Sequence, residues 1–322
     1  MKILQISSPD HAGLIEMAEP VPGPGEVLVR VEAVASCPHW DMTLMDGRDM
    51  FHRPGHPRYP IPPGQPGHEM TGVVEAVGPE VVGFEVGEPV VAWRTMGESK
   101  PGYYAEKACV PTEDLLHRPS SLSAAEAAGL EMAMCVACCF LVLPNLSGQR
   151  VSIGGLGPAG MIAVQMARAA GAARVIGFDP IPERCAFALS LGADEALDPT
   201  DAKVTSLRAS PGAQVDYAID CSGSAASVQF QMDIVGKGVA LFGVQHEPYL
   251  YQPRHWYSGL TVYGYPGHSL KAAQYAMQRL ESGEVRLAPL NSVELPLSRF
   301  ADGTALLAEH KALKVLYRLE NT

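Results

Sequence analysis

The sequence predicts an α/β protein of two domains, a strand-rich, barrel-like domain followed by a doubly wound parallel sheet. From Met1 to about Arg118, short valine-rich segments such as EVLVRVEAVA and EPVVAW are separated by proline and glycine, a pattern typical of consecutive strands. Beyond Gln149, apolar segments alternate with helical ones, which indicates parallel strands joined by helices. The length of 322 residues also favours two domains over one.

A change of pattern marks the predicted boundary between the domains. In SLSAAEAAGLEMAM, Ser123 and Glu126 form the Ser-x-x-Glu capping box that begins a helix. We expect residues 1–133 to form the strand-rich domain and 134–265 to form the parallel-sheet domain. The C-terminal segment 266–322 is expected to complete the first domain.

Composition and charge exclude several classes of protein. The net charge of −11 comes without a long lysine or arginine run, which argues against nucleic acid or an anionic membrane as a partner. The N-terminus lacks an apolar signal core, and the apolar run Met132–Leu143 is too short to cross a bilayer. The seven cysteines show no disulfide-framework spacing. We therefore expect a cytoplasmic protein with reduced thiols and a small-molecule substrate.

A glycine-rich turn predicts a dinucleotide site in the second domain. Gly155, Gly157 and Gly160 form G-x-G-x-x-G directly after the strand RVSI and open a helix. Asp179 ends the next strand, where a carboxylate can accept hydrogen bonds from ribose hydroxyls and would repel a 2′-phosphate. This order favours NAD over NADP, although Arg184 nearby could pair with such a phosphate.

Cysteine, histidine and glutamate in the first domain are candidate metal ligands. A catalytic zinc needs about three protein ligands and one open position. Cys37 ends a strand in VASCPHWD, and His68 and Glu69 end a loop in PGQPGHEMTG. The residue types by themselves leave two interpretations open: a zinc site, or a core cysteine beside a solvated His-Glu pair.

The segment GHEMTGVVEAVGPEV resembles the signature G-H-E-x2-G-x5-G-x2-V of zinc-containing alcohol dehydrogenases. Every fixed position matches, namely Gly67, His68, Glu69, Gly72, Gly78 and Val81. PVPGPGEVLVRVEAVASC and VSIGGLGPAG resemble further segments of this family, so the chain is similar to medium-chain dehydrogenases and reductases over essentially its whole length. The resemblance implies a GroES-like β-barrel catalytic domain and a Rossmann cofactor domain.

The resemblance also implies site residues and an activity. Cys37 and His68 match two zinc ligands, and Glu69 matches a glutamate that is a ligand or a near neighbour of the metal. Glu131 stands where relatives acting on polyols and sugars carry a glutamate ligand. The implied reaction transfers a hydride between a secondary alcohol, such as a polyol, sugar or cyclitol, and NAD, with zinc as a Lewis acid. A homodimer or homotetramer is implied as well.

The sequence departs from the family pattern at two places. Residues 92–107 lack the four cysteines of the family's structural zinc, so we expect one catalytic zinc and no structural zinc. His39 and Trp40 replace the usual proton-relaying hydroxyl and orienting aspartate beside Cys37. His39 either relays the proton or forms a polar wall of the pocket, and Asp41 is a candidate for the orienting role.

Two other functions are compatible with the same fold. The first is a zinc-free reductase that reduces an enone or quinone with NADPH, and the second is a non-catalytic nucleotide-binding protein. The reductase needs neither Cys37 nor His68, and their joint presence in the full signature argues against it.

Overall fold

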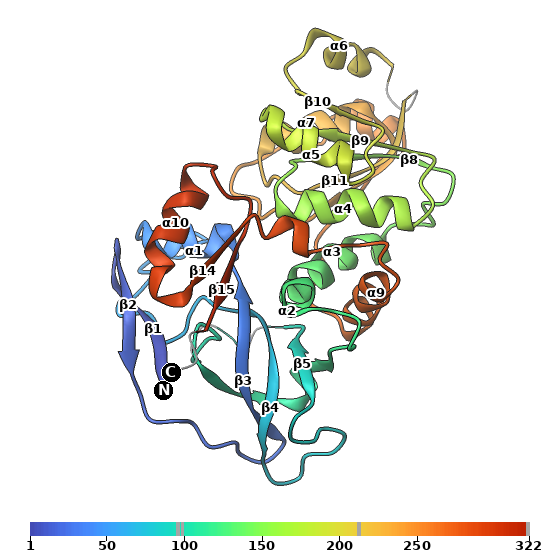
Figure 1. Ribbon diagram of the computed structural model, residues 1–322. Coiled ribbons are helices and arrows are strands. Elements are labelled where there is room, and N and C mark those ends of the chain that lie inside the picture. The colour runs from blue at the N-terminus through green and yellow to red at the C-terminus, as the bar shows by residue number, and fades with distance from the viewer. Residues whose placement is uncertain (95–96, 98–99, 211–213, 320–322) are drawn as a thin grey trace. The chain divides into compact units, whose positions relative to one another are not determined.

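The computed structural model describes residues 1–94, 97, 100–210 and 214–319, and the chain divides into two compact units (Figure 1). The first unit comprises Met1–Met132 and Leu287–Thr322, and the second comprises Ala133–Arg286.

The first unit is rich in strands, as the sequence predicts. Its elements in chain order are β1 (Lys2–Ser8), β2 (His11–Glu16), β3 (Glu26–Ala35), α1 (Pro38–Met45), β4 (Glu69–Val77), β5 (Pro89–Ala92), β6 (Lys107–Pro111), η1 (Thr112–Asp114), β7 (Leu115–His117), α2 (Ala124–Ala127), the start of α3 (Leu130–Val142), η3 (Ala288–Leu290), β14 (Val293–Pro296), η4 (Leu297–Arg299), α10 (Phe300–Ala308) and β15 (Val315–Arg318).

A sheet with the strand order β14-β15-β3-β4-β5-β7 forms the frame of this unit, and β6 also pairs with β3. The long strand β3 is buried along most of its length at valine, leucine and alanine residues, and its charged residues Glu26, Arg30 and Glu32 are the half-buried positions. β3 pairs antiparallel with β4 and with β15, so the C-terminal strand lies next to an N-terminal one (Figure 1).

An aromatic cluster joins the C-terminal segment to the first unit. The ring of Tyr104 lies 5.1 Å from that of Phe300 and 5.4 Å from that of Tyr317, measured between centroids and in edge-on geometry. All three side chains are buried. The last segment of the chain, from Leu287 on, is grouped with the first unit.

Only one of the two hydrogen bonds of the predicted capping box at α2 forms. The Ser123 hydroxyl accepts a hydrogen bond from the Glu126 backbone N–H at 3.2 Å. The Glu126 carboxylate does not complete the box, because it accepts the backbone N–H groups of Leu287 and Ala288, each at 2.9 Å. These two bonds fix the point where the chain re-enters the first unit.

The second unit alternates strands and helices. Its elements are the rest of α3, β8 (Arg150–Gly154), α4 (Pro158–Ala169), β9 (Arg174–Phe178), α5 (Pro182–Ser190), β10 (Glu195–Leu197), α6 (Ala202–Thr205), η2 (Ser206–Ala209), β11 (Val215–Asp220), α7 (Ala225–Ile234), β12 (Val235–Leu241), α8 (Pro253–Tyr257), β13 (Thr261–Tyr263) and α9 (Leu270–Glu281).

The strands of the second unit form one parallel sheet in the order β10-β9-β8-β11-β12-β13. Numbered within the unit, this order is 3-2-1-4-5-6, the arrangement of doubly wound dinucleotide-binding sheets. The predicted fold class, a strand-rich domain with a Rossmann-type domain, is confirmed.

The second boundary between the units lies later in the chain than the predicted one at residues 265–266. The helix α9 belongs to the second unit, which ends at Arg286. Arg286 donates its backbone N–H to the Gln165 side chain of α4 at 2.9 Å and accepts from that side chain at 3.2 Å. The sequence shows that α9 is amphipathic, but not which core receives its apolar face.

Residues 124–142 are long and apolar enough, by length and composition, to cross a membrane. In the structure, 78% of the apolar window is buried within the protein, as in the core helix of a globular domain. The predicted buried helix at the Met132–Leu143 run is present as α3.

Candidate active site

Cys37 lies at the junction of β3 and α1. It is the N-cap residue of α1, and Pro38 opens the helix with its fixed φ angle. The preceding residue, Ser36, is held by β15: its backbone N–H donates to the Val315 carbonyl, and its hydroxyl accepts from the Val315 N–H, both at 2.8 Å. The strand-to-helix turn therefore presents the Cys37 thiol from a fixed backbone.

His68 and Glu69 lie where the proline-rich loop between α1 and β4, residues 46–68, ends and β4 begins. Glu69 is the first residue of β4 and pairs with Ala35 of β3, which brings it beside the Cys37 turn. Gly67 before them is required by packing, because a Cβ atom there would lie 2.5 Å from the Tyr104 backbone nitrogen. The glycine of the signature lets the loop approach the chain at Tyr104.

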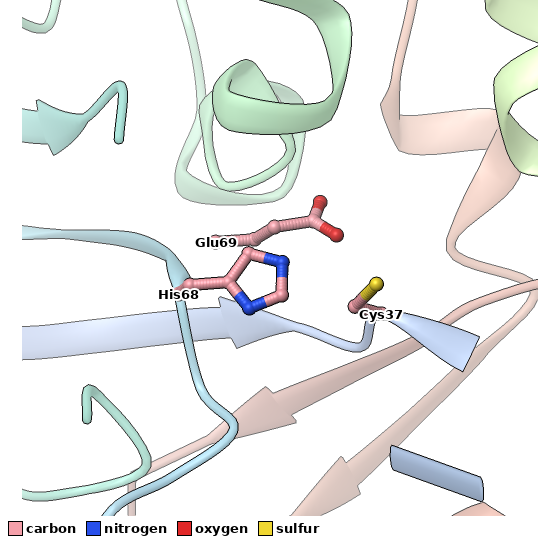
Figure 2. A group of neighbouring side chains, drawn as sticks. All are labelled: Cys37, His68 and Glu69. Carbon is pink, nitrogen blue, oxygen red and sulfur yellow. The ribbon is translucent and has the colours of Figure 1, made fainter. Parts of the chain in front are cut away.

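The structure brings Cys37, His68 and Glu69 together. One ligand atom from each of the three side chains lies within 4.8 Å of the other two (Figure 2). Tetrahedral zinc with Zn–N and Zn–S bonds of about 2.0–2.3 Å needs ligand separations of roughly 3.3–3.8 Å, so small side-chain adjustments suffice. Sulfur, imidazole nitrogen and carboxylate oxygen are the donors that zinc takes in catalytic sites. The residues fit a zinc ion.

The imidazole of His68 is oriented by a backbone carbonyl. Its Nδ1 lies 2.7 Å from the Pro66 oxygen, and a carbonyl can only accept, so Nδ1 carries a proton. Nε2 then faces the candidate metal position with its lone pair. The Pro66 carbonyl, rather than a carboxylate, supplies the orienting contact.

Glu131, in the first turn of α3, lies on the Nε2 side of the same imidazole. Its Oε2 is 3.6 Å from His68 Nε2, and the side chain is buried. Burial lowers the pKa of His68, but the Glu131 carboxylate and the Cys37 thiol overcome this effect and raise it well above the usual value. Metal binding at Nε2 requires the neutral imidazole, so a metal ion would compete with a proton for this nitrogen.

Lys314 is the partner of Glu69. Its ammonium donates to both carboxylate oxygens of Glu69, at 2.7 Å each, and both side chains are almost fully buried. Burial raises the pKa of Glu69, and the lysine charge opposes this rise. Lys314 belongs to no sequence motif, and its one signal in the sequence is a lysine inside the apolar segment ALKVLY.

The hydrogen-bond partner of Asp41 is Tyr104, not His68. Its Oδ2 accepts from the Tyr104 hydroxyl at 2.8 Å, and Oδ1 has no hydrogen-bond partner among the described residues. The carboxyl group is completely buried, and this desolvation raises its pKa to about 7. Asp41 therefore lies in the core behind the site.

His39 lies in the first turn of α1 with an exposed side chain. Its carbonyl accepts the Thr43 hydroxyl at 2.8 Å, an ordinary contact within the helix. Its ring is not one of the three grouped ligand donors. The adjacent Trp40 packs edge-on against Phe51 of the proline-rich loop, with ring centroids 5.8 Å apart.

In the second unit, the three glycines form the turn between β8 and α4. Gly155 has a φ of +81°, and a Cβ atom at Gly160 would lie 1.9 Å from the Gly155 carbonyl oxygen. Gly157 is the N-cap of α4, and a Cβ atom there would meet nothing within 4 Å. The first and third glycines are thus required by the fold, whereas the second leaves open space at the helix N-terminus.

Asp179 lies at the end of β9, next to this turn. Its carboxylate accepts the backbone N–H of Leu156 at 2.8 Å and that of Ile181 at 2.9 Å. Arg184 of α5 follows, with its Nη1 3.6 Å from Asp179 Oδ2. Asp179 is therefore hydrogen-bonded to the glycine turn through Leu156. The order of the two motifs in the sequence predicts that they lie close together.

Comparison with known proteins identifies two matching domain families. Residues 23–120 match the alcohol dehydrogenase GroES-like domain, and residues 158–282 match the zinc-binding dehydrogenase domain. An L-threonine 3-dehydrogenase from Pyrococcus abyssi is 28% identical over 96% of this chain and 95% of its own length. A relative of the same name from Pyrococcus horikoshii is 27% identical over the same shares.

Solved structures show the same fold. The alcohol dehydrogenase from Thermus sp. ATN1 superposes with a TM-score of 0.84 at 26% identity, covering 99% of this chain and all 100% of the other. The 2R,3R-butanediol dehydrogenase from Bacillus subtilis has a TM-score of 0.88 at 22% identity, covering 99% of both chains. The second likeness concerns the fold alone.

Proposed function

Because the chain belongs to the zinc-containing alcohol dehydrogenase family of the medium-chain dehydrogenases and reductases, we propose that it transfers a hydride between a secondary alcohol and NAD. The observation that carries this proposal is the convergence of Cys37, His68 and Glu69 in the first unit, beside Glu131. These residues offer sulfur, nitrogen and oxygen donors to a zinc ion.

The chain's own residues bind and orient the reacting groups. Cys37 and His68 would hold the zinc together with a carboxylate from Glu69 or Glu131, and the Pro66 carbonyl keeps His68 Nε2 directed at it. When bound, zinc supplies a Lewis acid at the alcohol oxygen and NAD supplies the hydride acceptor. His39 is proposed to carry the alcohol proton towards solvent, since imidazole titrates near neutral pH.

We propose NAD rather than NADP as the cofactor of the second unit. The buried Asp179 carboxylate at the end of β9 supports this, since it would accept ribose hydroxyls and repel a 2′-phosphate. Arg184 lies beside that carboxylate and would be attracted to it rather than to a phosphate. Gly155, Gly157 and Gly160 would admit the pyrophosphate to the α4 N-terminus.

The substrate class and assembly are also proposals. The relatives named L-threonine 3-dehydrogenase support a secondary alcohol with a neighbouring polar group, a class that includes polyols, sugars and cyclitols. One zinc per chain is proposed because residues 92–107 contain no cysteine. A homodimer or homotetramer in the cytoplasm is the proposed state.

The test combines metal analysis with turnover of an alcohol panel that includes L-threonine, 2,3-butanediol and polyols. Wild-type protein should contain one zinc per chain and reduce NAD faster than NADP. Cys37→Ala and His68→Ala should lose zinc and activity together. His39→Ala should keep its zinc but lose activity by about a hundredfold, the usual contribution of a general acid or base.

Matched controls are available in the same unit. Cys109→Ala on β6 and His117→Ala on β7 change the same residue types outside the grouped ligands and should retain zinc and turnover. Full zinc content and activity in both Cys37→Ala and His68→Ala would refute the proposed function.

A further inference from the structure

Asp220 is a buried carboxylate outside the candidate metal site and the glycine turn. It is the last residue of β11, which lies between β8 and β12 in the sheet of the second unit. The residue is 0% exposed, and burial raises the pKa of its carboxyl group. A buried carboxylate costs free energy unless hydrogen bonds compensate it, so its partners indicate its role.

The Asp220 carboxylate holds the turn that follows β11. Its Oδ1 accepts the hydroxyl groups of Ser222 at 2.8 Å and Ser227 at 2.7 Å. Its Oδ2 accepts the backbone N–H of Gly223 at 2.9 Å. Because Ser227 lies in the first turn of α7, the carboxylate ties the end of β11 both to the turn and to the helix after it.

The backbone at Asp220 reaches the ends of the two neighbouring strands. The Asp220 carbonyl oxygen accepts the N–H groups of Phe242 and Gly243, at 2.9 and 3.0 Å, in the turn after β12. The N–H of Cys221 donates to the carbonyl of Gly154, the last residue of β8, at 2.7 Å. One short segment therefore joins the turns after β8, β11 and β12.

Glycines let these three turns approach one another with no side chain between them. A Cβ atom at Gly155 would lie 2.8 Å from the Cβ atom of Ser222. A Cβ atom at Gly243 would overlap the backbone nitrogen of Gly223. The turn Ser222–Gly223, which the Asp220 carboxylate holds, therefore packs directly against the turns on both sides of it.

The three turns lie at the carboxyl ends of parallel strands, where a doubly wound sheet binds its ligand. Such a sheet consists of two halves, one for each nucleotide of a dinucleotide. The half β8-β9-β10 carries Asp179, the proposed partner of the adenosine ribose. The half β11-β12-β13 then faces the nicotinamide nucleotide, and the turns after β11 and β12 belong to this half.

We propose that Asp220 is a positioning residue for the nicotinamide half of the cofactor. Its carboxylate fixes the turn after β11 against the turns after β8 and β12, so the backbone that meets this half is ordered before the cofactor binds. Ordering a loop during binding costs affinity, and a preorganised turn avoids that cost. The inference rests on the proposed function, because it requires that NAD binds at the glycine turn.

The experiment compares the affinities of the full-length protein for NAD and for AMP by calorimetric titration. AMP fills only the adenosine half of the site, whereas NAD fills both halves. Asp220→Asn keeps the size of the side chain, but its amide nitrogen cannot accept, so at least one of the three bonds is lost. The variant should bind NAD about tenfold more weakly and bind AMP within about twofold of wild type.

Asp216→Asn is the matched control on the same strand. Asp216 lies near the amino end of β11, where its carboxylate accepts the backbone N–H and the guanidinium of Arg150. Its replacement removes a carboxylate of β11 at the edge of the sheet opposite the turns. Both affinities should therefore equal those of the wild type.

Ser222→Ala keeps the test decisive if Asp220→Asn fails to fold. It removes one hydroxyl donor to Asp220 and leaves the carboxylate in place. NAD affinity should fall by about threefold or more with AMP affinity retained. An equal loss of NAD and AMP affinity in the folded variants would show a structural role only and overturn the inference, as would unchanged NAD affinity.

The two proposals fail in different ways. If the wild-type protein binds neither NAD nor AMP, the proposed function itself fails. If the wild-type protein binds NAD and oxidises alcohols while the variants give the overturning affinities, only the role of Asp220 is wrong.

Discussion

Asp41 is a single residue whose ionisation opposes folding. Its pKa in the folded protein is raised to about 7 by burial, while the unfolded value is near 3.9. Between these values the folded state binds more protons than the unfolded state, so the free energy of unfolding falls as pH rises. The full decrease in the free energy of unfolding is reached above about pH 7.

We predict that Asp41→Asn gains stability over wild type as pH rises from 5 to 8, by on the order of 2–4 kcal/mol. The amide oxygen can still accept from the Tyr104 hydroxyl, so the contact survives at every pH. Denaturant unfolding of metal-stripped protein at several pH values provides the measurement. Parallel pH profiles for the two proteins would contradict the prediction.

At the residue scale, the signature identifies the neighbouring candidates His68 and Glu69, and the structure brings Cys37 close to them. Their role as zinc ligands stays a prediction. The Pro66 carbonyl and Lys314 were missed for a physical reason. A backbone acceptor has no residue-type signal, and Lys314 meets Glu69 from 245 positions away in the chain.

At the scale of an element, the turn into α4 contains two glycines that the fold needs, Gly155 and Gly160, and one, Gly157, that we propose to approach the cofactor. An added methyl at Gly160 would collide with the Gly155 carbonyl at 1.9 Å. At Gly157 it would enter open space, with φ −71° and ψ −170° that any residue can adopt. The open space lies where the pyrophosphate of a dinucleotide approaches the backbone.

We therefore predict different effects for two variants. Gly160→Ala should lower both stability and NAD affinity, because α4 must move away from β8. Gly157→Ala should change stability by less than about 0.5 kcal/mol yet weaken NAD binding by about tenfold or more. Thermal unfolding and calorimetric titration measure the two quantities; unchanged NAD affinity in Gly157→Ala would exclude this turn as the binding site.

At the scale of the whole molecule, each unit has its own core. Phe300 is buried against Tyr104 and Tyr317 in the first unit, and Phe230 packs edge-on to Phe178 at 5.0 Å in the second. The candidate metal ligands belong to the first unit and the glycine turn to the second. Damage to one core should therefore affect one site before the other.

Phe300→Ala should destabilise the first unit by about 3–5 kcal/mol and release zinc at a lower temperature, with NAD affinity at 20 °C retained. The matched variant Phe230→Ala should weaken NAD binding first and keep its zinc. Zinc content and NAD affinity measured after graded heating distinguish these outcomes. Equal loss of both functions in each variant would show that the units do not respond separately.

The sequence by itself predicted the two-domain α/β architecture and the glycine turn, and its resemblance to a known signature predicted Cys37, His68 and Glu69 as candidate ligands. The architecture and the turn depend on hydrophobic periodicity and turn residues, which act between neighbours in the chain. Only the tertiary structure decided that α9 belongs to the second unit, that a backbone carbonyl orients His68, and that Lys314 pairs with Glu69. Those contacts join distant segments, and sheet pairing and core packing select them after the local elements have formed.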